Sequence, residues 1–190
     1  MSDDGSLFWQ LVLQFILIFV NAVFASAEIA VISMNDNKLA RLTASGDKRA
    51  TRLSNLTQQP ARFLSTIQIG ITFAGFLGSA FAADNFAGRL TRWLIDIGLK
   101  VPATTLNTIS VILITFLLSY FTLVFGELVP KRIAMRNAEK LSLGMSGILY
   151  GISRIFGPLV GLLTASTNGV LRLLGIDPDE ADDNIFEEEI

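Results

Sequence analysis

The chain has no cysteine and no histidine among its 190 residues. The absence of cysteine excludes a disulfide framework and a thiolate metal site. The absence of histidine removes the commonest transition-metal ligand and the usual proton shuttle at neutral pH. A metal ion bound here must therefore be a hard cation held by oxygen, such as Mg²⁺, Ca²⁺, Mn²⁺ or Na⁺. Because the sequence also has no nucleophile–base pair and no phosphate-binding glycine loop, we do not expect an enzyme.

Charge is also scarce, and it is unevenly distributed. Charged residues make up 17% of the chain, whereas 51% of it is hydrophobic and the mean hydropathy is +0.53. Since the apolar residues fall in blocks, this composition predicts an integral membrane protein. The net charge is −2, but the last fourteen residues, Asp177–Ile190, carry eight acids and no base. The remainder is therefore basic, with a net charge of +6.

Three apolar segments are long enough to cross a bilayer, which needs about 20 apolar residues in a helix. They cover approximately residues 7–33, 63–83 and 106–125. A further apolar stretch within 138–174 is interrupted by glycines, Arg154 and Pro158, so we expect shorter helices at the membrane interface there. The predicted fold class is an all-α integral membrane protein with three transmembrane helices and juxtamembrane helices at about 36–58 and 138–174.

Lysine and arginine are concentrated in the 35–62 loop and after Glu127, whereas the N-terminal tail has only acids. By the positive-inside rule, we expect a multi-pass protein of the cell membrane with its N-terminus outside and its C-terminus in the cytoplasm. The basic loop contains regularly spaced leucines, which suggests amphipathic helices that meet anionic lipid. A solvated loop that only sets topology explains the pattern equally well. The loop lacks an aromatic platform, so we expect no nucleic-acid partner.

The most informative acid is Glu127, at the end of the third apolar segment. It follows Gly126 and precedes Pro130 and Lys131, so the sequence predicts a helix interruption with free carbonyls beside a carboxylate. Interrupted helices and intramembrane acids are typical of cation sites. The alternative is a juxtamembrane Glu127 paired with Lys131 or Arg132.

Polar residues inside the spans recur at helical spacing, which places them in stripes. Two full stripes on neighbouring spans suggest a shared polar interior, although hydroxyls that join helices without any ligand explain them as well. Asn21 and Glu28 of the first span share a face, whereas Ser26 points elsewhere. The stripe residues are Ser65, Gln68, Thr72 and Ser79 in the second span and Thr108, Thr115, Ser119 and Thr122 in the third.

Three motifs resemble the transmembrane (DUF21) domain of the CorC/CNNM family. They are Phe24–Ala30 (FASAEIA), Ser65–Thr72 (STIQIGIT) and Gly126–Lys131 (GELVPK), in the family's order and spacing. The resemblance covers essentially the whole chain, so 1–176 is expected to be this domain. The acidic end, 177–190, resembles the linker toward cytoplasmic CBS domains, which are absent from this chain.

The resemblance implies a homodimeric transporter that exports Mg²⁺, with Na⁺ as the proposed coupling ion. It implies a cation site open to the cytoplasm, with Ser26, the carbonyl of Gly126 and Glu127 as ligands. It also implies polar ligands in the second span. Many Mg²⁺-handling members have asparagines at the positions held here by Ile71 and Gly75.

Ser65, Gln68 or Thr72 are candidates to replace the missing amide oxygens. Because some relatives with this type of second span are linked to polyamine export, a polyamine exporter of the same fold is the first alternative. A membrane ion sensor without transport activity is the second.

Overall fold

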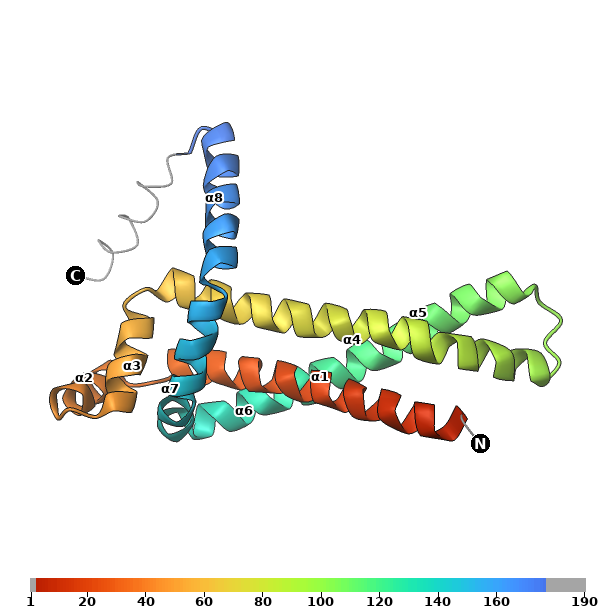
Figure 1. Ribbon diagram of the computed structural model, residues 1–190, viewed down its shortest axis with the longest axis horizontal. Coiled ribbons are helices and arrows are strands. Elements are labelled where there is room, and N and C mark those ends of the chain that lie inside the picture. The colour runs from red at the N-terminus through yellow and green to blue at the C-terminus, as the bar shows by residue number, and fades with distance from the viewer. Residues whose placement is uncertain (1–2, 177–190) are drawn as a thin grey trace.

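The computed structural model describes residues 3–176 and the side chains from Leu7 onward, and this part of the chain contains helices but no strand (Figure 1). The predicted acidic linker, 177–190, lies outside the described residues. The elements are α1 (Asp3–Ile32), α2 (Asp36–Ala44), α3 (Lys48–Thr57), α4 (Pro60–Asp96), α5 (Ala103–Leu123), the π-helical η1 (Val124–Leu128), α6 (Val129–Arg136), α7 (Ala138–Ile155) and α8 (Gly157–Leu173).

Three helical segments are long and apolar enough to cross a membrane: Leu7–Ile32, Pro60–Asp96 and Ala103–Arg136. This agrees with the three predicted spans, but the second is longer than the predicted 63–83. The helix continues through Gly88 and ends only before Gly98. Gly98 has a φ of +93° and its N–H bonds to the carbonyl of Ile95, which is a glycine-terminated helix end.

Small residues let α1 and α4 pack closely along the bundle. The face of α4 that is buried in the bundle carries Gly70, Ala74 and Gly78. A Cβ atom built on Gly70 would lie 2.6 Å from the ring of Phe24 on α1, and Phe24 is itself only 8% exposed. Close approach through glycine is the usual means of helix association in lipid, where no hydrophobic effect drives it.

Gly70→Ala should therefore destabilise the fold. The added methyl group has to displace the buried ring of Phe24, and overpacking of this kind costs about 1–3 kcal/mol. The matched control is Gly75→Ala on the same helix, since a Cβ atom at Gly75 meets nothing within 4 Å. We expect thermal unfolding in detergent at a lower temperature for Gly70→Ala only. Equal unfolding temperatures for the two variants would contradict this packing.

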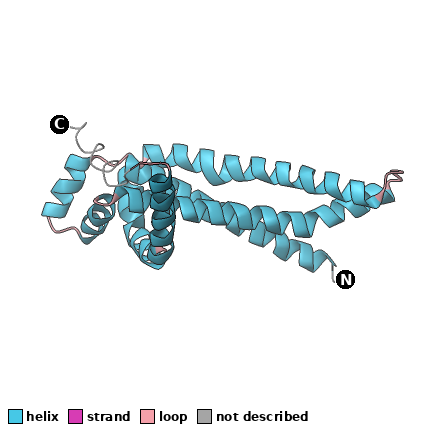
Figure 2. Ribbon diagram, turned by 90° about the horizontal axis from the view of Figure 1, so that it is seen from above, coloured by secondary structure: helices cyan, strands magenta, loops and turns pink. Residues whose placement is uncertain are grey.

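The short helices gather at one end of the three spans. Leu39, Leu53 and Leu56 of α2 and α3 are buried in one cluster with Leu143 and Leu149 of α7. The helices α7 and α8 meet at a bend of 61°. Figures 1 and 2 show that α8 runs across the direction of α1 and α4, as an interfacial helix does.

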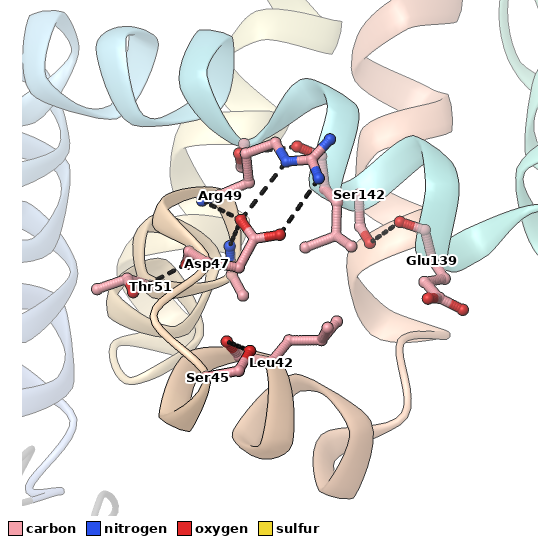
Figure 3. A network of polar contacts seen from close by, with 10 residues as sticks. Leu42, Ser45, Asp47, Arg49, Thr51, Glu139 and Ser142 are labelled. Atoms are coloured by element: carbon pink, nitrogen blue, oxygen red, sulfur yellow. Dashed lines mark hydrogen bonds and ion pairs between the residues drawn. The ribbon is translucent and has the colours of Figure 1, made fainter.

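The turn between α2 and α3 is held by Asp47 (Figure 3). Its carboxylate caps α3 by accepting from the backbone N–H of Arg49 at 2.7 Å, and it pairs with the Arg49 guanidinium at 3.2 Å. These bonds with Arg49 hold the pKa of Asp47 below its usual value. The stabilisation by this cap is therefore present above the usual pKa of an aspartate and is lost as the pH falls through the lowered value.

Candidate cation site

The third span continues through Glu127 without a break. The prediction of a helix interruption there was wrong, because α5, η1 and α6 form one helical segment, Ala103–Arg136. The irregularity is instead one π-helical turn, Val124–Leu128, in which the N–H of Val129 bonds to the carbonyl of Val124. Single π-helical turns inside α-helices are frequent at functional sites. The wider turn accommodates Pro130, whose ring would clash with a carbonyl in a regular helix.

The carbonyl of Gly126 is the point where α1 contacts this turn. Pro130 has no N–H, so the carbonyl four residues before it loses its usual helical donor. The side chain of Asn21 on α1 replaces that donor, with Nδ2 3.1 Å from the Gly126 oxygen. Glycine at 126 allows the approach, since a Cβ atom there would lie 3.1 Å from Asn21 Nδ2 and 3.3 Å from the carbonyl of Ile18. The predicted free carbonyl is thus present, but Asn21 occupies it.

Two acids from different helices share one lysine. The ammonium of Lys131 on α6 lies 2.9 Å from Glu127 Oε1 and 3.1 Å from Glu28 Oε2 of α1. The three side chains are 22–33% exposed, so solvent reaches the cluster only in part. The pairing of Glu127 with Lys131 that the sequence offered as an alternative is therefore confirmed. The second acid, Glu28, is 103 residues away from Lys131 in the chain, and the cluster keeps a net charge of −1.

Several oxygen atoms along α1 are buried without a donor. Oδ1 of Asn21 and both amide atoms of Gln14 have no hydrogen-bond partner among the described residues, whereas buried Oε2 of Glu28 has the Lys131 ammonium alone. These residues are seven positions apart, on one face of the helix. A buried polar atom without a partner costs free energy, more so in a membrane, and suggests a missing water or ligand. Sequence reasoning missed Gln14, although the spacing of 14, 21 and 28 was readable.

The predicted second-span residues lie elsewhere. Ser65 lines a cavity between α4 and α8, and Gln68 is exposed and donates to Thr72 Oγ1 at 3.4 Å. Ser119 of the third span is exposed as well, so the two stripes do not enclose a shared interior within one chain. The reason is that the buried face of α4 carries Gly70, Ala74 and Gly78 rather than the predicted stripe residues. Ile71 packs against the core cluster that contains Phe24.

The remaining first-span candidate, Ser26, is half-buried on α1 two residues before Glu28. Its hydroxyl forms no hydrogen bond with any residue between 3 and 176, so its role as a ligand stays a prediction. The same part of the chain contains no group of three or more acids that would hold a metal ion by carboxylates alone. A cation at Glu28 and Glu127 would therefore be completed by carbonyl or amide oxygens and by its own water, an arrangement that Mg²⁺ tolerates.

A family model described as the Cyclin M transmembrane N-terminal domain (CNNM) matches residues 12–190. The chain belongs to this family. A UPF0053 protein of Synechocystis, sll0260, is 39% identical over 176 residues, which is 93% of this chain and 39% of that protein. The chain is thus a multi-pass membrane domain of the CNNM type, in agreement with the resemblance found in its motifs.

Two further relatives carry more specific names. A protein of Haemophilus influenzae named polyamine export protein is 32% identical over 166 residues, covering 84% of this chain and 36% of that protein. The Escherichia coli UPF0053 inner membrane protein YfjD is 28% identical over 160 residues, covering 84% of this chain and 34% of that protein. The CNNM-type chain therefore spans less than two fifths of the length of these relatives.

Proposed function

We propose that the chain is the membrane domain of a dication transporter, with Mg²⁺ as the leading cargo and export coupled to Na⁺ as the direction. The observation that carries this proposal is the pair of carboxylates, Glu28 and Glu127, that converge from α1 and the π-helical turn on one cation, the ammonium of Lys131. Intramembrane acids that face one another across helices mark ion paths. We further propose a homodimer with the N-terminus outside and the C-terminus in the cytoplasm.

The row of buried polar atoms on α1 supports a path through the bundle. Gln14, Asn21 and Glu28 place oxygen atoms about 10 Å apart, because seven residues of an α-helix rise by that distance. Oxygen ligands at such intervals suit a hydrated divalent ion that exchanges waters one at a time. In this proposal, Asn21 and the Gly126 carbonyl separate and turn toward the ion when it enters.

A polyamine is the second candidate cargo, and two observations favour it. The site already holds a primary ammonium between two carboxylates, and a polyamine carries ammonium groups at its ends. Ile71 adds no oxygen near this site, which makes full dehydration of Mg²⁺ harder. The relative named polyamine export protein is consistent with this candidate.

Flux from liposomes tests the proposal. We expect reconstituted protein to move Mg²⁺, followed with a trapped indicator, and an inward Na⁺ gradient to increase its export. Putrescine added at equal concentration should compete if the two dications share Glu28 and Glu127. Putrescine flux without Mg²⁺ flux would transfer the assignment to polyamines. Saturable binding of either dication without any flux would contradict transport and leave a membrane ion sensor.

A further inference from the structure

An open cavity of about 370 Å³ lies away from the cation site, at the junction of α3, α4 and α7. Its wall includes two arginines, Arg62 at the start of α4 and Arg154 at the end of α7, and four neutral polar residues, Asn55, Gln59, Tyr150 and Ser153. The remaining wall residues contain no acid. The volume falls within the range of about 300–1,000 Å³ that is typical of ligand pockets.

The positive charges of the two arginines are not neutralised by neighbouring acids. Between residues 3 and 176, neither Arg62 nor Arg154 forms an ion pair, and Arg62 donates only one long bond, 3.5 Å, to Gln59 Oε1. Two unpaired guanidiniums that line one concave wall attract an anion with several acceptor oxygens, because a guanidinium presents a planar set of donors that matches phosphate. The hydroxyl of Tyr150 adds a further donor to the same wall.

The position of the cavity indicates which kind of molecule would supply a phosphate group to the two arginines. Arg62 also lines a second cavity, of about 580 Å³, between α4 and α8, and its Nη2 would lie 3.1 Å from a Cβ atom at Gly157, where α7 bends into α8. The helix α8 runs across the spans from this bend (Figure 1), and its Leu162 and Leu173 are 63% and 88% exposed. A helix with this orientation and apolar surface lies at the level where headgroups meet acyl chains.

We propose that Arg62 and Arg154 form a binding site for the phosphate of an anionic phospholipid headgroup, with the acyl chains alongside α8. Basic pockets between helices at the membrane surface commonly bind such headgroups. This narrows the expected contact of the basic loop with anionic lipid to one built cavity, and half of its charge comes from α7, outside that loop. The site is independent of transport and stands or falls separately from Glu28 and Glu127.

Native mass spectrometry of the detergent-purified chain, titrated with dioleoyl phosphatidylglycerol or dioleoyl phosphatidylcholine, tests the site. We expect retained phosphatidylglycerol, weak retention of phosphatidylcholine, and at least a tenfold loss of phosphatidylglycerol affinity in the Arg62→Gln/Arg154→Gln double variant. The control is Arg41→Gln/Lys48→Gln, which removes the same charge from exposed residues of α2 and α3 outside the cavity. Its affinity should change less than threefold.

A second variant separates loss of the site from loss of the fold. Arg62→Lys/Arg154→Lys keeps both charges but removes the planar donors, so we expect an intermediate affinity with an unchanged helical circular dichroism spectrum. Equal losses in the glutamine double variant and its control would overturn the proposal in favour of diffuse surface charge. Inorganic phosphate that displaces the lipid at low millimolar concentration would overturn the lipid assignment in favour of a soluble anion.

Discussion

Glu127→Gln is expected to lower the affinity for the transported dication by roughly 10- to 150-fold and to abolish flux at concentrations that saturate the wild-type protein. The estimate follows from the loss of one charge-assisted interaction, about 1.5–3 kcal/mol. The substitution keeps the size and one oxygen of the side chain, so the packing of the π-helical turn should survive. The charge of the cluster of Glu28, Glu127 and Lys131 changes from −1 to zero, and this change should remove its attraction for a cation.

Isothermal titration of Mg²⁺ and of putrescine, with flux measured in parallel, would check this expectation. The matched control is Glu139→Gln, which also removes one acid paired with a lysine, Lys38, but in a pair whose side chains are 45% and 54% exposed and lie outside the cluster. We expect Glu139→Gln to retain wild-type binding and flux, because exposed pairs contribute little. Unchanged dication affinity in Glu127→Gln would remove Glu127 from the site and leave the proposed path without its central ligand.

Lys131→Gln is expected to have two opposite effects, since its ammonium occupies the position between the acids that a cargo cation would take. Without cargo, Glu28 and Glu127 would face each other unpaired, so the free energy of unfolding should fall. The loss should stay below the roughly 3–5 kcal/mol known for fully buried pairs, because the cluster is partly exposed. With cargo, the site charge of −2 and the absent competitor should raise dication affinity at least about tenfold, equivalent to ~1.4 kcal/mol.

Thermal unfolding with and without Mg²⁺ or putrescine distinguishes this tethered competitor from a simple structural ion pair. Without dication, we expect Lys131→Gln to unfold at a lower temperature than wild type. Saturating dication should raise its unfolding temperature by more than it raises that of wild type. The control, Lys38→Gln, breaks the exposed pair with Glu139 and should change neither value by much. If dication raised the unfolding temperature of Lys131→Gln by less than that of wild type, Lys131 would favour binding of the cation rather than compete with it.

The Lys131→Gln variant also distinguishes the two candidate cargoes, Mg²⁺ and a polyamine. Mg²⁺ is a compact ion that keeps several waters, whereas a polyamine presents ammonium groups like that of Lys131. If the cargo is a polyamine, Lys131→Gln should improve putrescine affinity more than Mg²⁺ affinity, because the vacated position already has the geometry of an ammonium held at 2.9 and 3.1 Å. The opposite order would favour Mg²⁺.

Most of the helical architecture was readable from local properties of the chain. Hydropathy and length predicted three spans. Gly157 and Pro158 predicted that the C-terminal stretch would divide into two helices, α7 and α8. These features depend on the residues of a few consecutive helical turns, so a single sequence is enough to predict them. The motif around Glu127 identified the family correctly, and the family match over residues 12–190 confirmed it.

The error at Glu127 has a local cause. Gly126 and Pro130 lie four positions apart, a pattern that usually ends a helix. A local pattern does not show whether a neighbouring helix can compensate for the missing N–H of the proline. Here Asn21 supplies the donor that Pro130 lacks, so the chain widens by one π-helical turn and continues. The outcome depends on a side chain 105 residues earlier, and no local pattern contains that information.

The sequence by itself determined that this protein is helical, has three segments long and apolar enough to cross a membrane, contains no cysteine or histidine, and places Glu127 four residues before Lys131. These are properties of residue type and local spacing. Only the tertiary structure decided that α1 lies against α6, so that Lys131 pairs with both acids, while side-chain oxygens of Gln14 and Asn21 are buried without donors. The physical reason is that helix packing in lipid depends on which small residues allow close approach, and at Gly70 and Gly126 that requires the neighbouring helix in place.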